Sequence, residues 1–123
     1  MMIYKIFISV LMMTTIFFMD RNKRQILIFG NDEHPSLVQQ QIALFDKEVT
    51  GIKERDLKII IVSKDDLLNK KYQIKTGLFT VILLGKDGTE KFRTDEILLT
   101  QKLFAIIDAM PMRQAEMKNT NTQ

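Results

Sequence analysis

The sequence predicts a single α/β domain, in which a mixed four-stranded sheet is flanked by helices and preceded by an N-terminal hydrophobic signal segment. Three short, continuous apolar runs, at residues 25–29, 57–62 and 79–84, have the length of buried strands. The segments between these runs carry apolar residues at helical spacing. A chain of 123 residues, of which 46% are hydrophobic, can build one core but not two. We therefore expect one domain of the mixed α/β type.

The first segment has the pattern of an export signal. Residues 6–19 carry no charge, Lys5 precedes them, and Asp20 and several basic residues follow. The run is shorter than the roughly 20 apolar residues of a typical membrane-spanning helix. However, no small-x-small cleavage site precedes Asp20, and the basic residues after the run oppose simple translocation. We expect residues 1–19 to be a signal peptide or a signal anchor, so that the protein is periplasmic, secreted or extracellular, or is held at a membrane by this segment alone.

The first half of the domain has the pattern of two parallel strands joined by a helix. Gln25–Phe29 is an apolar run ended by Gly30, which predicts a strand covered on both faces. A helix follows, with Pro35 near its first turn and Gly51 placed to end it. Its inward positions, at spacings of four, three and four, are Val38, Ile42, Phe45 and Val49. Leu57–Val62 is the second strand, and a helix between two such strands implies that they are parallel.

The middle of the chain predicts a short helix and then a hairpin. Ser63–Lys75 contains the helical candidate, whose inward residues are Leu67, Leu68 and Tyr72. Phe79–Leu84 is a third buried strand, and Gly85–Gly88 has the composition of a turn. Thr89–Arg93 alternates polar and apolar residues, which is typical of an edge strand with one wet face.

A last helix is expected after the hairpin. It begins near Thr94 or Asp95, and Pro111 cannot continue it without losing a hydrogen bond. Its core-facing residues are Leu99, Leu103, Ile106, Ile107 and Met110. The remaining residues, 118–123, are expected to form a polar tail.

The composition excludes several kinds of chemistry. The chain has no cysteine, so disulfides, thiolate metal sites and thiol nucleophiles are absent. A net charge of +3 is too small to predict a nucleic-acid partner, and the short basic clusters that include Arg24 and Arg55 are interpreted as solvated surface. The lone His34 forms no triad, and the C-terminal methionines fit a core better than a copper site. We expect no metal and no cofactor.

The order β-α-β-α-β-β-α is that of the thioredoxin core, and four short motifs strengthen the comparison. These motifs are Asn22–Phe29, Glu54–Leu57, Leu84–Gly88 with Lys91, and Ile107–Arg113 with Glu116 and Met117. Together they resemble the P-DUDES domain family, over about residues 22–117. This is a family of thioredoxin-like or peroxiredoxin-like domains in small exported bacterial proteins and in vertebrate extracellular-matrix and sushi-repeat proteins. The resemblance implies a thioredoxin-like fold, an exported location, and an unknown or adhesive role.

The resemblance supplies no catalytic residue. Redox relatives of this fold place a cysteine in the loop after the first strand, here Gly30–Pro35, and often a proline before the third strand, here near Thr76–Leu78. This chain has neither residue at these places. Thiol-disulfide exchange and cysteine peroxidase chemistry are therefore excluded.

Six charged residues of the last third form a candidate interaction or polar site. They are Lys86, Asp87, Lys91, Asp108, Arg113 and Glu116. The Gly85–Gly88 segment could cradle an anion, although ordinary hairpin chemistry also explains it. Likewise, Arg113 could belong to a binding site, or could pair with Asp108 or Glu116 and cap helix carbonyls. The structural interpretation is favoured for both segments and for Arg55-Asp56.

The leading functional hypothesis is an exported, non-catalytic thioredoxin-like domain that binds another protein or an extracellular polymer. One alternative is a cysteine-independent enzyme, which requires the candidate charged side chains to converge around one pocket. Another is a membrane-anchored envelope stress or assembly factor.

Overall fold

The computed structural model describes residues 22–121, which form a four-stranded mixed sheet with helices on both faces. The strands are β1 (Arg24–Phe29), β2 (Leu57–Ile61), β3 (Thr80–Leu84) and β4 (Glu90–Thr94). They lie in the order β2-β1-β3-β4, with β1 parallel to β2 and antiparallel to β3, and with β3 antiparallel to β4. The predicted sheet and the predicted hairpin are thus confirmed. The predicted signal segment, residues 1–19, lies outside the described residues.

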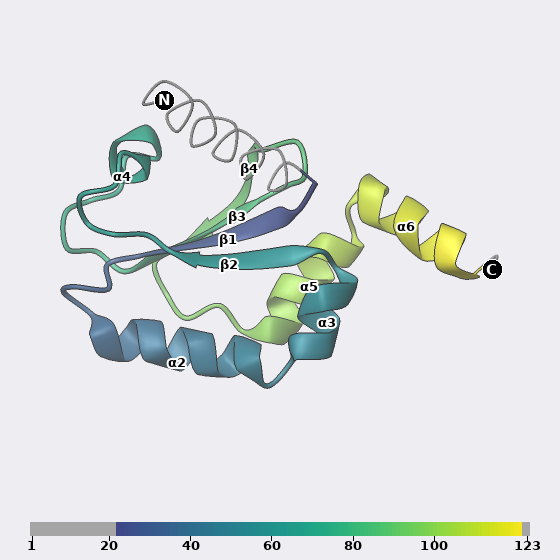
Figure 1. Ribbon diagram of the computed structural model, residues 1–123, viewed down its shortest axis with the longest axis horizontal. Coiled ribbons are helices and arrows are strands. Elements are labelled where there is room, and N and C mark those ends of the chain that lie inside the picture. Colours follow the sequence, from purple (N-terminus) through teal and green to yellow (C-terminus); the bar gives the residue numbers. More distant parts are fainter. Residues whose placement is uncertain (1–21, 122–123) are drawn as a thin grey trace, which may run out of the picture.

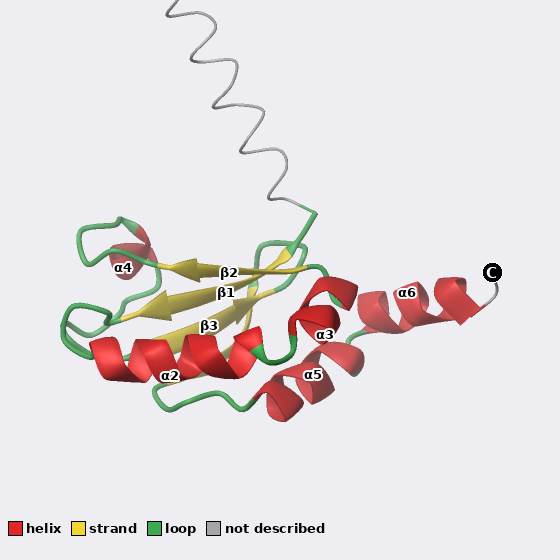
Figure 2. Ribbon diagram, turned by 60° about the horizontal axis from the view of Figure 1, so that its bottom comes forward, coloured by secondary structure: helices red, strands yellow, loops and turns green. Residues whose placement is uncertain are grey.

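The helices are distributed unevenly over the sheet. They are α2 (Pro35–Asp46), α3 (Val49–Glu54), α4 (Leu68–Lys71), α5 (Thr100–Asp108) and α6 (Pro111–Asn121). Figure 1 shows α2, α3 and α5 on one face and α4 on the other, and both ribbon views show α6 extending away from the sheet (Figure 1, Figure 2). None of the helices in residues 22–121 is long and apolar enough to cross a membrane.

Strand β1 is the centre of the core because both of its faces are covered. Its alternate residues Ile26 and Ile28 pack with the buried side chains of α2 and α5. Leu27 and Phe29 point to the other face, in a cluster that includes Ile82. Each fully buried aliphatic or aromatic side chain contributes about 1.5–3 kcal/mol. The continuous apolar run of β1 therefore reflects burial on both faces, as predicted.

The first helix is shorter than predicted, and a second one follows it. Helix α2 ends at Asp46, and Val49, expected in the core, is 47% exposed. Gly51 does not end a helix but lies inside α3, where a Cβ atom would come within 2.6 Å of the Phe104 ring. The predictions for Val49 and Gly51 are therefore wrong. Val49 begins α3 at the surface, and Gly51 is needed because the Phe104 ring of α5 packs directly against it.

The short helix α4 covers the second face with fewer residues than predicted. Leu68 and Tyr72 pack against the cluster around Leu27 and Phe29, as expected. Leu67 was predicted to face inward, yet it is 82% exposed. With only four residues, α4 has room for a narrow apolar stripe, and Leu67 lies outside it.

The last predicted helix starts later than expected, and a further helix, α6, follows it. Thr94 ends β4, and α5 starts only at Thr100. Between them, the amide oxygen of Gln41 accepts a hydrogen bond from the Leu98 N–H, and its amide nitrogen donates one to the Leu98 carbonyl, so this segment is tied to α2. Leu99, expected in the core, is therefore exposed at the helix start.

Pro111 marks both a stop and a start. Helix α5 ends at Asp108, before Pro111, as the position of this proline predicts. Pro111 is also the first residue of α6. Proline fits the first turn of a helix, where its missing N–H leaves no hydrogen bond unmade. Residues 118–121, predicted to belong to a polar tail, are part of this helix.

The loop after β1 contacts the segment that precedes β3. Gly30 has a φ of +91°, and a Cβ atom there would lie 2.7 Å from the carbonyl oxygen of Leu78. These two segments also line a small hollow of about 140 Å³. Gly30 is therefore required both by its backbone conformation and by a close backbone contact.

A left-handed backbone conformation costs a residue with a side chain about 1–2 kcal/mol. We expect Gly30→Ala to lower the free energy of unfolding by more than this. The added Cβ would meet backbone atoms of Leu78 and Phe79, which cannot rotate away. Gly88→Ala is the matched control, because Gly88 has a φ of +80° with no atom within 4 Å of the new Cβ. Urea unfolding of both variants tests this, and equal losses would contradict the contact argument.

Candidate functional site

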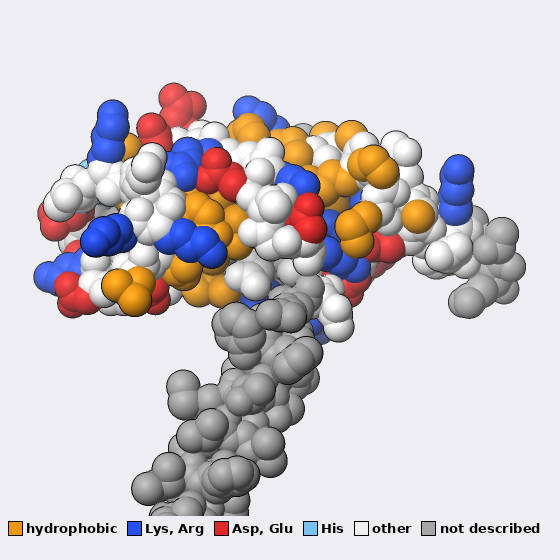
Figure 3. All heavy atoms as spheres, turned by 90° about the horizontal axis from the view of Figure 1, so that it is seen from above, with side chains coloured by type: hydrophobic (Ala, Val, Ile, Leu, Met, Phe, Trp, Pro, Cys, Tyr) orange, Lys and Arg blue, Asp and Glu red, His pale blue; other side chains and the backbone are white. Residues whose placement is uncertain are grey.

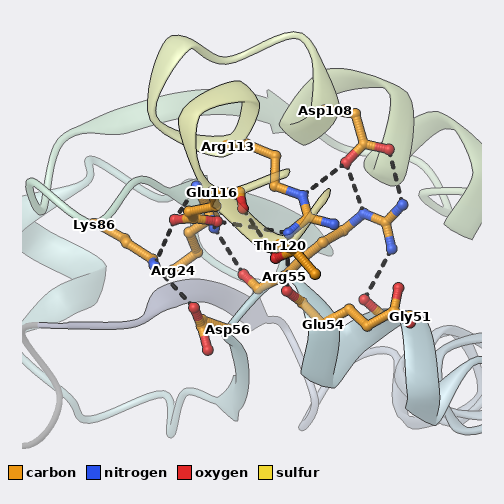
Figure 4. A network of polar contacts seen from close by, with 10 residues as sticks. All are labelled: Arg24, Gly51, Glu54, Arg55, Asp56, Lys86, Asp108, Arg113, Glu116 and Thr120. Atoms are coloured by element: carbon orange, nitrogen blue, oxygen red, sulfur yellow. Dashed lines mark hydrogen bonds and ion pairs between the residues drawn. The ribbon is translucent and has the colours of Figure 1, made fainter. Parts of the chain in front are cut away.

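One end of the sheet collects charged side chains from five parts of the chain. They come from the start of β1, the link between α3 and β2, the hairpin turn, the end of α5 and the middle of α6 (Figure 4). We call this cluster the ion-pair network; its members are Arg24, Arg55, Asp56, Lys86, Asp108, Arg113 and Glu116.

The first half of the ion-pair network is centred on Asp108, at the end of α5. Arg55 donates two hydrogen bonds to its carboxylate, from Nε at 3.0 Å and from Nη2 at 2.8 Å. Arg113 adds a third at 3.2 Å and also donates to the carbonyl of Glu54 at 3.0 Å. The bond from Arg55 is the main cause that holds the pKa of Asp108 below its ordinary value; burial opposes it and Arg113 reinforces it. This half holds the C-terminal ends of α3 and α5 close to each other.

The second half is centred on Glu116, in α6. Arg24 donates to both of its carboxylate oxygens, at 3.2 and 3.3 Å, and Lys86 donates at 2.6 Å. Lys86 also donates to Asp56 at 2.9 Å. Burial would raise the pKa of Glu116, but the hydrogen bonds from Lys86 and Arg24 outweigh it and lower that pKa. Burial would lower the pKa of Lys86, but its bonds to Asp56 and Glu116 raise it.

The two halves meet where Arg113 approaches Glu116, at 3.6 Å. Within residues 22–121, no buried side-chain nitrogen or oxygen lacks a hydrogen-bond partner. The geometry is therefore that of a structural network that holds these elements together. Arg113 pairs with Asp108 and Glu116 and donates a hydrogen bond to the carbonyl of Glu54, the last residue of α3. Four cations face three carboxylates in it, so it carries one excess positive charge.

The hairpin turn has its own set of local contacts. Asp87 accepts hydrogen bonds from the backbone N–H of Thr89 at 3.0 Å, from its hydroxyl at 2.8 Å, and from Lys91 at 3.1 Å. The two bonds from Thr89, aided by Lys91, lower the pKa of Asp87 to about 2. Gly88 supplies the positive φ of the turn. Asp87 is thus engaged in turn formation.

A groove lies between the hairpin and the junction of α5 and α6. Its volume is about 540 Å³ and its lining is mostly apolar. The residues around it are Arg24, Gly85, Lys86, Asp87, Lys91, Ile106, Ala109, Met110, Pro111 and Met112. Of the six candidate residues, Lys86, Asp87 and Lys91 line the groove, whereas Asp108, Arg113 and Glu116 lie beside it in the ion-pair network. The structure therefore does not bring all of the candidate charges around one cavity.

Sequence reasoning missed the most buried member of the site. Arg24 was interpreted as solvated surface, yet its side chain is only 1% exposed. A signal was available, because Arg24 shares a face with Ile26 and Ile28 by the two-residue period of a strand. Arg55 is also largely buried, and its guanidinium lies 3.8 Å from the centre of the Phe104 ring.

Redox proteins of this fold carry a reactive cysteine in the loop after β1, and in this chain that loop, Gly30–Pro35, contains no thiol. Gly30 packs against Leu78 there, and the surrounding hollow is small. In the described part of the chain, no group of three or more His, Cys, Asp or Glu side chains is placed to hold a metal ion.

The chain belongs to the family described as "Domain of unknown function (DUF4174)", whose profile matches residues 18–116. Two solved structures of malaria parasite proteins are similar. One, titled "Structure of a malarial protein", is 25% identical with a TM-score of 0.53, and the match covers 71% of this chain and 96% of that one. The other, thioredoxin-2, is titled as a component of the malaria parasite protein secretion machinery; it is 24% identical with a TM-score of 0.53, and the match covers 72% and 84%. No curated protein matches. The chain is thus a cysteine-free DUF4174 domain with a thioredoxin-like fold.

We expect Glu116→Gln to lower the free energy of unfolding by roughly 2 kcal/mol, because it leaves the buried Arg24 guanidinium without its carboxylate. The loss stays below that of a fully buried pair, since the Glu116 side chain is 27% exposed. Glu90→Gln breaks a surface pair with Arg93 and should cost less than about 1 kcal/mol. Urea unfolding compares the two variants, and equal losses would show that the burial of Arg24 is irrelevant.

The stability of the domain should also fall in acid. The folded pKa values of Asp108 and Glu116 lie below the ordinary values of 3.8 and 4.5. Their contribution is therefore complete above about pH 5 and is lost as the pH falls through the folded pKa values. Urea midpoints measured from pH 6 down to about pH 3 should decline, and less steeply in Glu116→Gln. Parallel declines would rule out Glu116 as a contributor.

Proposed function

We propose that this protein is an exported, non-catalytic thioredoxin-like binding domain of the P-DUDES type, whose partner is another protein or an extracellular polymer. Support for the location comes from the uncharged run at residues 6–19, which resembles an export signal. Support for a role without redox chemistry comes from the absence of cysteine.

The observation that carries the proposal is the mutual pairing of the candidate charged residues. An acid or base that works near neutral pH needs a pKa close to that pH. Here the pKa values of Asp108 and Glu116 are lowered and that of Lys86 is raised, so each moves further from neutrality. Such groups keep one charge state across the physiological range. Such groups are better suited to hold the elements of a binding surface in place than to transfer protons.

The proposed contact surface is the groove together with the hairpin beside it. Met112 is 54% exposed at the start of α6, and Met110 lies on the same lining. Flexible methionine side chains can adapt to different apolar partners. In the space-filling view, hydrophobic side chains are exposed toward the end that carries α6 and also near the middle of this face, in both places beside Lys, Arg, Asp and Glu side chains (Figure 3). An apolar area with a charged rim is typical of an interaction surface.

We expect the tagged protein to retain specific components from cell-envelope or matrix material, and Met112→Glu to abolish their retention. A charge at this position would have to lose its hydration when a partner covers the groove. Leu67→Glu is the matched control, because Leu67 is also exposed and apolar but lies beside α4, at the other end of the molecule (Figure 1). Retention is measured by affinity capture and mass spectrometry. If nothing is retained and a small molecule is turned over, the domain is an enzyme instead.

A further inference from the structure

We propose that the groove binds a single-chain amphiphile with a carboxylate head, such as a fatty-acid-like molecule. The tail would lie on the apolar wall formed by α5 and the start of α6, and the head would lie at Lys86 and Lys91. This names a ligand class for the contact surface proposed above, and rests on that proposal only for the place of the site.

The size and the apolar wall of the groove fit such a tail. A volume of about 540 Å³ falls within the roughly 300–1,000 Å³ of small-molecule sites. One wall consists of aliphatic and thioether side chains at the end of α5 and the start of α6, among them Ile106, Met110 and Met112. Each methylene of a tail that lies against such a wall removes apolar surface from water and so favours binding. Neutral sugars or strongly charged polymers would leave this wall without an apolar partner.

The opposite wall carries two lysine ammonium groups, Lys86 and Lys91, that can bind a head group. Lys86 donates to Asp56 and Glu116, which uses two of the three donors of an ammonium group. Its third donor can therefore bind a carboxylate in the groove.

Gly85 gives this wall its shape. A Cβ atom at Gly85 would lie 2.6 Å from Cε and 3.3 Å from Cγ of Lys91. The absence of a side chain therefore lets the Lys91 stem lie across the turn, where it extends the apolar surface. The Lys91 ammonium group pairs with the exposed Asp87 at 3.1 Å, at the rim of the groove. Such an exposed pair is weak, so its lysine can turn toward a bound carboxylate.

Methionine methyl groups provide a direct test in the full-length protein. The chain has eight methionines, of which Met110 and Met112 line the groove and Met117 does not. With isotope-labelled methionine, we expect dodecanoate below its micellar concentration to shift the methyl NMR signals of Met110 and Met112, with saturation, and to leave Met117 unchanged. Dodecyltrimethylammonium has the same tail and the opposite charge, and should bind at least about tenfold more weakly. Equal binding of both probes, or no shift at Met110 and Met112, would overturn the proposal.

Two charge variants locate the head group. Lys86→Gln should weaken dodecanoate binding about tenfold, whereas Lys70→Gln removes the same charge from α4 and should leave binding unchanged. The methyl spectrum without ligand shows whether each variant is folded. If Lys86→Gln is not folded, Lys91→Gln takes its place, with the same expected direction. Equal affinity of the wild type and Lys86→Gln, or Lys91→Gln in its place, would put the carboxylate elsewhere and overturn the proposal.

A membrane surface also offers acyl chains with anionic head groups, and an experiment with lipid vesicles distinguishes it from a free amphiphile. Phosphatidylglycerol vesicles should leave the Met110 and Met112 signals unchanged, and shifts caused by vesicles but not by free dodecanoate would overturn the proposal. If dodecanoate does not bind while envelope material is still retained, the ligand class is wrong and the binding role stands. If dodecanoate binds and nothing is retained from envelope material, the amphiphile site stands and the protein-docking or polymer-docking role falls.

Discussion

The arrangement of this domain depends on a buried arginine at the start of its central strand. Arg24 lies on the face of β1 that also carries Ile26 and Ile28, so the sheet takes its guanidinium out of water along with the apolar side chains. A buried cation without an anion is costly, by about 3–5 kcal/mol when its partner is removed. Glu116 supplies that anion, and the carbonyl of Arg55 accepts a further hydrogen bond at 2.9 Å.

The same requirement explains how α6 is held. No residue of α6 between Pro111 and Thr120 is buried, so apolar packing does little to fix this helix. Its contacts with the rest of the domain are mainly polar: Arg113 in its first turn reaches Asp108 and the carbonyl of Glu54, and Glu116 reaches Arg24 and Lys86. Because Lys86 belongs to the hairpin, one carboxylate joins α6 to both β1 and the turn. The groove lies between the hairpin and the start of α6, the two elements that this carboxylate joins.

The sequence predicted features that depend on neighbouring residues and missed those that depend on distant ones. The hairpin follows from a glycine-rich turn between two strand patterns, and the Arg113–Asp108 pair spans five positions of the chain. The Arg24–Glu116 pair spans 92 positions, and no local pattern announces it. Gly51 and Leu99 were misassigned for the same reason, since a ring of α5 and the side chain of Gln41 decide their environments. Local rules therefore gave the elements, and long-range contacts set their ends.

The placement of the groove also separates this domain from the chemistry of its fold. A fold does not carry its relatives' activity unless the residues of the site are present. In thioredoxin-like redox proteins the reactive position follows the first strand, and here that position is taken by Gly30, packed against Leu78. The groove lies at the opposite end of β1, beside Arg24, and a strand of six residues spans roughly 20 Å. A ligand in the groove would therefore not touch the loop after β1. The position where redox proteins of this fold carry a thiol and the proposed contact surface lie at opposite ends of the sheet, so a change at one need not disturb the other.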